Sequence, residues 1–587
     1  MRASLPSMRY GLYVPLAFSL AFLCGNAYAA EFFVDPTAGT ANGDGSSAQP
    51  WQTLEAVVQA GHFGKTIHAG DTVWLKTGYH GAMTISGGTY APPITVAAGA
   101  GQTARLSRLS FAQTHGWVVS GLSISPSHAP TPRVGNMVQM DKATSDVVVK
   151  SCELFSVPDA SAWGATEWIN SASSAFQVSG DHITVSGNIA KNVRFGISVD
   201  GPNALIENNQ IVNFSADGLR GLGDFGVFQY NLVKNVYVDD AAGDTNHDDG
   251  FQSWSVGTGG VGTGVVTGVV LRGNVFLNRE DPNQKLSNAM QGVGCFDGLF
   301  DGWVVENNVV VTDHWHGISF YGMKNSRIVN NTVIDVNNVS PGPPWIMVTP
   351  HKDGRVSENV LIRNNLATDY DLGGTAIVQD HNTTLTSANL ASFFVDPAKF
   401  DLHLLRTAPA VDTASADQAP ALDADRIPRP QGAAADLGAY EWHDPSVKPD
   451  GGAGTGGAGG SGTGGASGTG GASGGAGGKG GTAGSGGSSG TGAGGSGSGG
   501  ASAGGSSGAG TGGIGGAGAG GTGAAGGAGD PDAGTAGGTS GSSSGCGCAV
   551  GRSTSTRTAW ILLGMLFLRG RVRKKVEPSA RASRAKE

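Results

Sequence analysis

The middle of the chain holds side chains of the types that carry out acid–base catalysis. Imidazole and carboxylate groups can take up or donate protons, and guanidinium and amide groups can stabilise negative charge as it develops. The residues that we single out as catalytic are Asp217, Arg220, His247, Asp249 and His316. Those that we single out as substrate-binding are Gln252, Gln291, His314, Tyr321 and Lys324.

These residue types suit β-elimination of a uronic-acid polymer. In that reaction a base removes the proton α to the carboxylate, while cationic or amide groups stabilise the resulting enediolate. We expect His247, or the pair His314 and His316, to supply the base. The side chains around the substrate carboxylate would be Arg220, Gln252 and Gln291.

Other activities on the same kind of polymer remain open. Hydrolysis needs two carboxyl groups across the scissile bond, and Asp217, Asp248 and Asp249 are candidates for them. An epimerase would share the proton abstraction with a lyase. A glycan-binding or adhesion protein without catalysis would use aromatic rings that stack on sugars; the candidates are Trp254, Trp303, Trp315, Tyr321 and Trp345.

The run Asp244-Thr245-Asn246-His247-Asp248-Asp249 is rich in oxygen-bearing side chains. Because Ca²⁺ prefers carboxylate and amide oxygens, Asp244, Asp248 and Asp249 are candidate calcium ligands. The same composition is also typical of a solvated loop, and the sequence leaves both interpretations open.

A recurring asparagine indicates how these residues are positioned. It follows short apolar segments at Asn188, Asn209, Asn231, Asn274, Asn308, Asn331 and Asn365. The short spacings of 21 and 22 residues set the unit, and the longer ones indicate a unit with an insertion, or two units where the spacing is 43. Such a period is typical of a solenoid whose repeats bury their apolar faces on one another. We predict an all-β, right-handed parallel β-helix over residues 31–445, with asparagine amides hydrogen-bonded from coil to coil.

Aligning the strand before each asparagine predicts which side chains meet. Since side chains alternate along a strand, the inward residues should be Ile197, Leu219, Phe251, Met290 and Ile318. One polar column then contains Arg220, Gln252 and Gln291, and a second contains Asp217, Asp249, Asn288 and His316. The second column reaches the surface only if a turn ends just before the residue that follows. Insertions fall beside both columns, as is typical of binding loops.

Both borders of this region carry a family resemblance. Glu31-Phe32-Phe33-Val34-Asp35-Pro36, followed by Pro50-Trp51-Gln52-Thr53-Leu54, is similar to the opening strand and capping helix of secreted right-handed parallel β-helix proteins. The segment from Phe400 to Glu441 resembles their terminal strand and cap. The resemblance implies the fold and a polysaccharide lyase-like role, although that superfamily hosts lyases, hydrolases, epimerases and binding proteins.

Short motifs resemble particular enzymes within it. Asp248-Asp249 and His316-Gly317-Ile318-Ser319 resemble polygalacturonase signatures, but Trp315 stands where glycine would precede the histidine. Asn246-His247-Asp248-Asp249 is similar to the His/Asp motif of alginate epimerases.

The two ends of the chain read as targeting and spacer segments. Residues 1–30 have the basic, apolar and small-residue order of a signal peptide. Residues 446–545 are mostly Gly, Ser, Ala and Thr and are predicted to form a disordered linker. Residues 546–587 resemble the C-terminal sorting signal of myxobacterial surface proteins, with a Cys motif, a short membrane segment and a basic end. We therefore expect a secreted, surface-displayed monomer that meets a membrane only through this tail.

Charge and cysteine content fit this organisation. The whole chain has a net charge of −9, to which residues 552–587 contribute +8 and Arg2 and Arg9 contribute +2, so residues 31–551 carry −19. A body this acidic argues against a nucleic-acid partner, which requires a basic footprint. Cys152 and Cys295 lie in different repeats, and we expect both to be buried free thiols.

Overall fold

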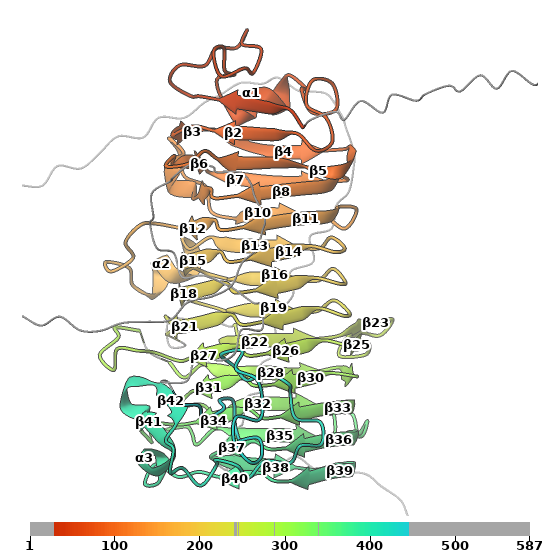
Figure 1. Cartoon of the computed structure of the whole chain (residues 1–587), viewed down its shortest axis with the longest axis vertical. Helices are drawn as coiled ribbons and strands as arrows, with labels where there is room; N and C mark the ends of the chain where they lie inside the picture. The colour runs from red at the N-terminus through yellow and green to blue at the C-terminus, as the bar shows by residue number, and fades with distance from the viewer. Residues whose placement is uncertain (1–28, 240–243, 245, 287, 339, 445–587) are drawn as a thin grey trace, which may run out of the picture. The chain divides into compact units, whose positions relative to one another are not determined.

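The computed structural model describes residues 29–239, 244, 246–286, 288–338 and 340–444. The predicted linker and sorting tail, and the first 28 residues of the predicted signal peptide, lie outside the described residues. Within them the chain winds through three parallel sheets, coil after coil, which confirms the predicted parallel β-helix (Figure 1). We number the sheets in the order in which a coil passes through them.

Sheet 1 has eleven strands in the described region. It comprises β4 (Ala82–Ser86), β7 (Arg108–Ala112), β10 (Asn136–Met140), β13 (Ser174–Val178), β16 (Ile197–Val199), β19 (Leu219–Gly221), β22 (Asp249–Trp254), β28 (Gln291–Asp297), β32 (His316–Tyr321), β35 (Trp345–Thr349) and β38 (Asp369–Leu372).

Sheet 2 has fifteen strands in the same region. It comprises β1 (Glu31–Val34), β2 (Thr72–Leu75), β5 (Thr89–Ala98), β8 (His115–Ser120), β11 (Ser145–Lys150), β14 (Thr184–Ser186), β17 (Leu205–Glu207), β20 (Val227–Gln229), β25 (Val265–Thr267), β26 (Val270–Arg272), β29 (Leu299–Asp301), β30 (Val304–Glu306), β33 (Met323–Val329), β36 (Glu358–Arg363) and β39 (Thr375–Asp380).

Sheet 3 has twelve short strands among the described residues. It comprises β3 (Gly78–Tyr79), β6 (Ala104–Leu106), β9 (Ser123–Ile124), β12 (Glu153–Phe155), β15 (Ile189–Val193), β18 (Gln210–Phe214), β21 (Leu232–Val236), β27 (Val275–Leu277), β31 (Val309–Val311), β34 (Thr332–Ile334), β37 (Leu366–Ala367) and β40 (Thr383–Thr384).

The remaining elements lie outside the three sheets. They are the hairpin β23 (Val256–Gly257) and β24 (Gly260–Val261), the pair β41 (Phe394–Asp396) and β42 (Asp401–Leu404), and the helices α1 (Leu54–Gln59), α2 (Ala165–Asn170) and α3 (Leu390–Phe393). Single 3-10 turns span Pro126–His128 and Pro397–Lys399. No described helix has the length and apolar character needed to cross a membrane.

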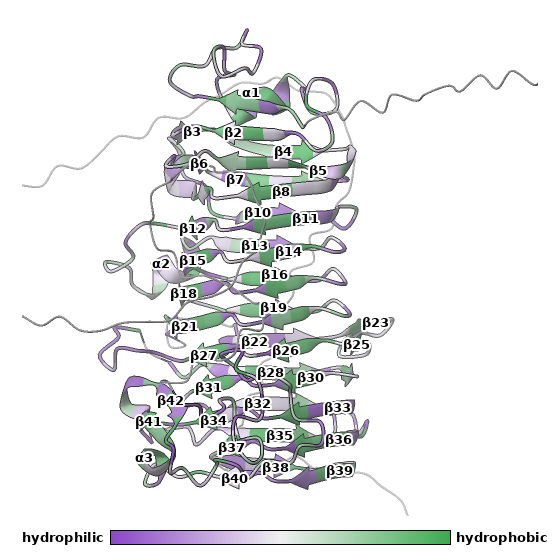
Figure 2. Ribbon diagram, in the orientation of Figure 1, coloured by the Kyte–Doolittle hydropathy of each residue, from purple (hydrophilic) through white to green (hydrophobic). Residues whose placement is uncertain are grey.

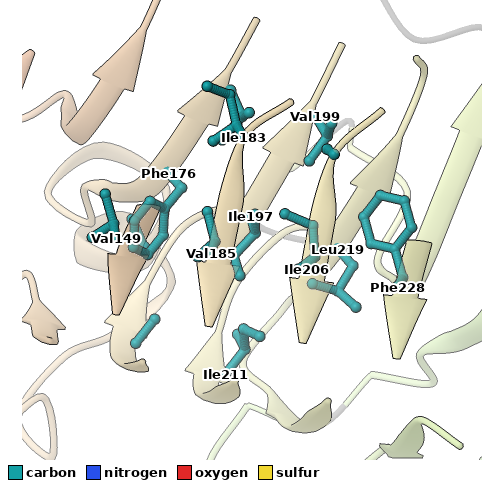
Figure 3. Packing of buried hydrophobic residues seen from close by; sticks show 14 of the residues in the cluster. Val149, Phe176, Ile183, Val185, Ile197, Val199, Ile206, Ile211, Leu219 and Phe228 are labelled. Atoms are coloured by element: carbon teal, nitrogen blue, oxygen red, sulfur yellow. The ribbon is translucent and has the colours of Figure 1, made fainter. Parts of the chain in front are cut away.

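The interior is filled by the inward side chains of all three sheets. Phe176, Ile197 and Leu219 stack on successive coils of sheet 1 and meet residues such as Val185 of sheet 2 (Figure 3). Apolar and polar residues alternate along many strands, as the green and purple bands of Figure 2 show. Burying one such side chain contributes about 1.5–3 kcal/mol, so stacking stabilises every coil through its neighbours.

The asparagine ladder is confirmed between sheets 2 and 3. Asn231 Nδ2 donates to Asn274 Oδ1 at 2.9 Å, and Asn274 Nδ2 donates to Asn308 Oδ1 at 3.0 Å. The same bond continues to Asn382, one coil beyond the last predicted member. Each amide also donates to a strand carbonyl, as Asn274 does to Phe228 at 2.9 Å. The ladder therefore satisfies a row of buried polar groups.

The 43-residue spacing was predicted to hold two coils, and this is wrong. Asn231 bonds directly to Asn274, and β20 pairs with β26, so the interval is one coil. Two insertions account for its length: residues 237–248 between β21 and β22, and a hairpin of β23 and β24 after β22. Hydrogen bonds between stacked asparagines, rather than the spacing, define the coil.

The C-terminal segment packs against the outside of sheet 3. Apolar residues from 402–439 cluster with outward side chains of β27, β31, β34 and β37, including Val309 and Ile334. The buried Arg429–Glu441 ion pair, at 2.7 Å, holds this segment together. Cys152 and Cys295 are buried free thiols, as expected.

Candidate functional site

Each coil in the centre of the domain enters sheet 1 through a glycine. The glycines are Gly196, Gly218, Gly250, Gly292 and Gly317. A Cβ on Gly218 would lie 2.2 Å from Cγ1 of the core residue Val233, so this position faces the interior and admits no side chain. Because neighbouring residues alternate in direction, the residue before each glycine faces outward. Asp217 and Asp249 therefore point outward at this corner, but both side chains are buried, so this part of the predicted column does not reach the exposed surface.

The strand register corrects part of the predicted alignment. Phe251 pairs with Val293 and Asp249 pairs with Gln291, whereas the sequence alignment had placed Met290 beside Phe251 and Gln291 beside Gln252. Asn288 consequently precedes β28 instead of joining the column. In the observed register, the outward residues that directly precede the corner glycines of successive coils are Asp217, Asp249, Gln291 and His316.

Asp217 and Arg220 form an ion pair beneath the outer surface. Arg220 Nε donates to Asp217 Oδ2, and Asn246 Nδ2 donates to the other carboxylate oxygen at 3.2 Å. The Arg220 guanidinium lies over the ring of Phe195, 4.1 Å from its centroid, and within 5.1 Å of Trp254. Burial raises the pKa of Asp217, and the charge of Arg220 opposes this shift. The pair is thus held rigidly by both hydrogen bonds and stacking.

Asp249 is a fully buried carboxyl group beside this pair. Its Oδ2 accepts a hydrogen bond from Gln252 Nε2 at 3.0 Å, whereas Oδ1 has no hydrogen-bond partner among the described residues. A Cβ on Gly294 would lie 2.2 Å from this Oδ1, so a glycine is required there. Burial, followed by the charges of Asp217 and Asp248, raises the pKa of Asp249 well above its ordinary value. The folded surroundings therefore favour the protonated form of this carboxyl over the ionised form.

Three histidines gather at the same edge of sheet 1. His314 and His316 stack with ring centroids 5.2 Å apart, and Nδ1 of His316 lies 3.0 Å from the Ser319 hydroxyl. Burial, and then the charge of nearby His247, lowers the pKa of His314 to about 4. Burial, then His314 and His247, lowers the pKa of His316 to about 3. Both imidazoles are therefore uncharged at neutral pH.

A pocket of about 240 Å³ opens between these groups and the loops that precede β22 and β28. Its polar lining consists of Asn246, His247, Asp248, Asn288, Gln291 and His314. The predicted His247, His314 and Gln291 thus come together in one cavity. Asn246 and Asn288 join them there, and neither had been given a binding role.

Insertions build the wall of this pocket, as the spacing of the asparagines had indicated. Residues 237–248, 278–290 and 335–344 connect sheet 3 to sheet 1 in three of four successive coils. Asp244 anchors the first of them, because its carboxylate receives two hydrogen bonds from Arg194, at 2.9 and 3.0 Å. Arg194 lies 50 residues earlier in the chain and had not been singled out.

Other predicted site residues lie elsewhere. Lys324 belongs to β33 in sheet 2, where it pairs with Glu358 at 2.7 Å. Tyr321 ends β32, and its ring contacts Phe296 with centroids 5.4 Å apart. Trp303 is completely buried and is a core residue instead of a sugar-stacking one.

Ca²⁺ requires several oxygen ligands around one ion, and the structure shows how the predicted calcium ligands lie. Among the residues that the structure describes, no group of three or more His, Cys, Asp or Glu side chains is arranged to hold a metal. The carboxylate of Asp244, a predicted calcium ligand, is engaged in an ion pair with Arg194. Gln291 Oε1, like Asp249 Oδ1, is a buried oxygen without a hydrogen-bond partner in the described part of the chain. Asp248 and Gln291 line the pocket and carry oxygen donors of the type that Ca²⁺ prefers, whereas the carboxyl of Asp249 is completely buried.

Comparisons with known proteins concern the fold. No protein-family model and no curated protein sequence matches the chain. Among solved structures, pectate lyase Pel9A is 13% identical, with a TM-score of 0.40, and the match covers 70% of this chain and 96% of that one. A rhamnogalacturonan lyase is 13% identical, with a TM-score of 0.36 and coverages of 66% and 97%. The lacto-N-biosidase of Eubacterium ramulus is 14% identical, with a TM-score of 0.34 and coverages of 60% and 68%.

Proposed function

We propose that this protein acts on polysaccharide and cleaves an acidic glycan by β-elimination. The observation that carries the proposal is the pocket in which His247 meets the uncharged His314 and the amides of Asn246, Asn288 and Gln291. Elimination needs an uncharged base and hydrogen-bond donors aimed at the oxygens that gain charge. The pocket offers both types of group within one small volume.

His247 is the base in this scheme, because it lines the pocket on the loop before β22. Removal of its proton-accepting imidazole should lower the rate by about 10²- to 10⁴-fold. The amide groups of Asn288 and Gln291 would bind the carboxylate of the uronate as the enediolate forms. A bound Ca²⁺ held by Asp248 and Gln291, which both line the pocket, would neutralise the same charge.

Hydrolysis is the second candidate, and the buried carboxyl of Asp249 favours it. A protonated carboxyl can serve as a general acid if a second, ionised carboxylate such as Asp248 lies across the bond. Asp249 is, however, completely covered, and a proton donor must reach the glycosidic oxygen. We therefore rank elimination first.

The test incubates the full chain with polygalacturonate, alginate and a neutral galactan, with and without calcium. New ultraviolet absorbance from unsaturated ends supports elimination, and new reducing ends without that absorbance indicate hydrolysis. Altered uronate stereochemistry with neither product indicates epimerisation, and binding alone indicates an adhesion protein. His247→Ala should abolish the reaction, whereas His182→Ala, at a 62% exposed site outside sheet 1, should not change it.

The proposal extends to where the protein works. The signal-like residues 1–30 and the tail at 546–587 support export and display at the cell surface. Cell fractionation with an antibody against the β-helix domain would test this, and a cytoplasmic location would contradict it.

A further inference from the structure

The outer face of sheet 2 changes character along the stack of coils. One outward row runs in register through the sheet, and from Lys150 onward its members are polar or charged in six successive coils: Lys150, Ser186, Glu207, Gln229, Arg272 and Glu306. At the N-terminal end the same row begins with Phe33 and Trp74, on the paired strands β1 and β2 (Figure 1). Aromatic side chains therefore stand where the later coils place polar groups.

Small residues follow these two rings in the same row: Trp74 pairs with Ala97, and Ala97 pairs with Ser120. A pocket of about 320 Å³ lies beside the rings, lined by Glu31, Phe33, Trp74 and Lys76 and, around the next turn, by Gly99, Ala100 and Gln102. Pockets from about 300 Å³ upward are large enough for small ligands.

The orientation of Trp74 is fixed by its polar edge. Its indole Nε1 donates to Glu31 Oε1 at 3.1 Å, so the ring cannot turn freely. Both Phe33 and Trp74 are half-buried, and both line the hollow. A fixed aromatic face beside a cavity is the arrangement on which the C–H face of a pyranose ring stacks. Lys76 lines the same cavity and supplies a positive charge for a sugar carboxylate.

We propose that Phe33, Trp74 and Lys76 form a second, non-catalytic binding site for one unit of an acidic polysaccharide. The choice of ligand rests on the proposed function, since the domain would otherwise have no reason to meet a uronate. The site lies on sheet 2, whereas the candidate catalytic pocket lies at the edge of sheet 1. It would hold the polymer to the protein independently of cleavage.

Affinity electrophoresis of the full chain tests the proposal, with polygalacturonate or alginate in the gel and with the methyl-esterified form of each. Trp74→Ala should weaken retention by about tenfold, as expected for loss of one stacked ring. Lys76→Gln should remove the preference for the carboxylate form over its ester. Trp74→Phe keeps an aromatic ring and should keep most of the retention, provided that its thermal unfolding matches that of the parent. Phe225→Ala, at a 55% exposed aromatic in the turn that precedes β20, is the matched control and should behave as the parent.

The outcomes separate this site from the catalytic one. His247→Ala should be retained like the parent. Retention that depends on Trp74 in a parent that cleaves nothing would leave this proposal standing and overturn the proposed function. No retention of the parent in any gel, equal retention of parent and Trp74→Ala, or equal loss in Phe225→Ala would each overturn the second site.

Discussion

Replacement of Asp249 by Asn should stabilise the protein at neutral pH. The parent carboxyl is buried beside Asp217 and Asp248, and these surroundings raise its pKa well above the ordinary value. An asparagine is uncharged at every pH and has nearly the same shape. Its Oδ1 can accept the hydrogen bond from Gln252.

The pH dependence gives the magnitude and sign of this effect. In the unfolded chain Asp249 loses its proton near its ordinary pKa of 3.8, whereas the folded protein retains the proton to higher pH. Between these two pKa values the folded state binds one more proton, so stability falls by about 1.4 kcal/mol for each pH unit. The contribution of the protonated carboxyl to stability is thus complete below its pKa in the unfolded chain, and it declines as the pH rises toward its pKa in the folded protein. The Asn variant lacks this decline.

Urea unfolding followed by tryptophan fluorescence, between about pH 4 and pH 8, measures the effect. We expect the variant to equal the parent near pH 4 and to exceed it at pH 7 by at least about 1.4 kcal/mol. Asp217→Asn is the control with the opposite sign, because it leaves Arg220 without its buried counter-ion and should cost about 3 kcal/mol. Parallel pH profiles of parent and Asp249→Asn, or a lower stability of the variant at pH 7, would refute a protonated Asp249.

The same variant discriminates between the two candidate reactions. If Asp249 donates a proton during hydrolysis, the asparagine should reduce the rate by about 10²-fold or more. If His247 performs an elimination, the variant should retain most of its activity, because the buried carboxyl then only supports the site.

Three further predictions concern the fold. Asn274→Ala removes hydrogen bonds at two buried partners and should lower the unfolding free energy by about 3 kcal/mol in urea titrations. A change below about 1 kcal/mol, the value of one ordinary hydrogen bond, would contradict the ladder. Gly218→Ala drives a Cβ into a core side chain and should cost about 2 kcal/mol, whereas Gly373→Ala meets only ordinary contacts and should be nearly neutral in the same assay. Hydrogen bonds to Asp425 and a second carboxylate raise the pKa of His403 from 6.5 to about 9, so the parent should lose stability as pH rises through about 9. His403→Gln should not show that loss, and identical thermal midpoints for parent and variant from pH 6.5 to 9 would contradict it.

The fold was predictable because one polar residue repeats at a place where polarity is costly. A buried asparagine such as Asn308 is tolerated when its amide bonds to a neighbour of the same kind. Because this asparagine recurs once in each coil, its positions mark the coils in the sequence. The prediction of two coils in the 43-residue interval was wrong because a spacing alone cannot distinguish a second coil from an insertion.

Only part of the candidate site was predictable. The alignment around β28 failed because it matched the polarity of Asn288 and Gln291 with that of Asp249 and Gln252. The sequence held a better signal: Gly292 repeats the corner glycine of Gly250, and matching these two places Gln291 beside Asp249. Only a glycine fits at the interior corner, whereas the outer face accepts several polar residue types. The glycine is therefore the better guide to the strand register.

No repeating residue in the sequence indicated the contacts that the loop before β22 makes. Asn246 bonds to Asp217 and Arg220, and Asp244 bonds to Arg194, two coils earlier in the stack. A loop of this length has no periodicity from which its side-chain directions could follow. Its conformation is set by partners that become neighbours only when the coils stack.

The corners of the coil explain why the pocket lies where it does. The turn between sheets 2 and 3 is two residues long in every coil from β14 to β40, because the second residue must be a ladder asparagine. The first adopts a left-handed conformation, as Asn208 and Asn307 do with φ of 55° and 56°. An insertion here would separate stacked amides and leave buried polar groups unpaired, at about 1–3 kcal/mol each. The corner between sheets 3 and 1 requires only a glycine at its end, so a loop of any length can precede it. Insertions can therefore accumulate at that corner without breaking the stack, and His247 and Asn288 lie on two of the three that line the pocket.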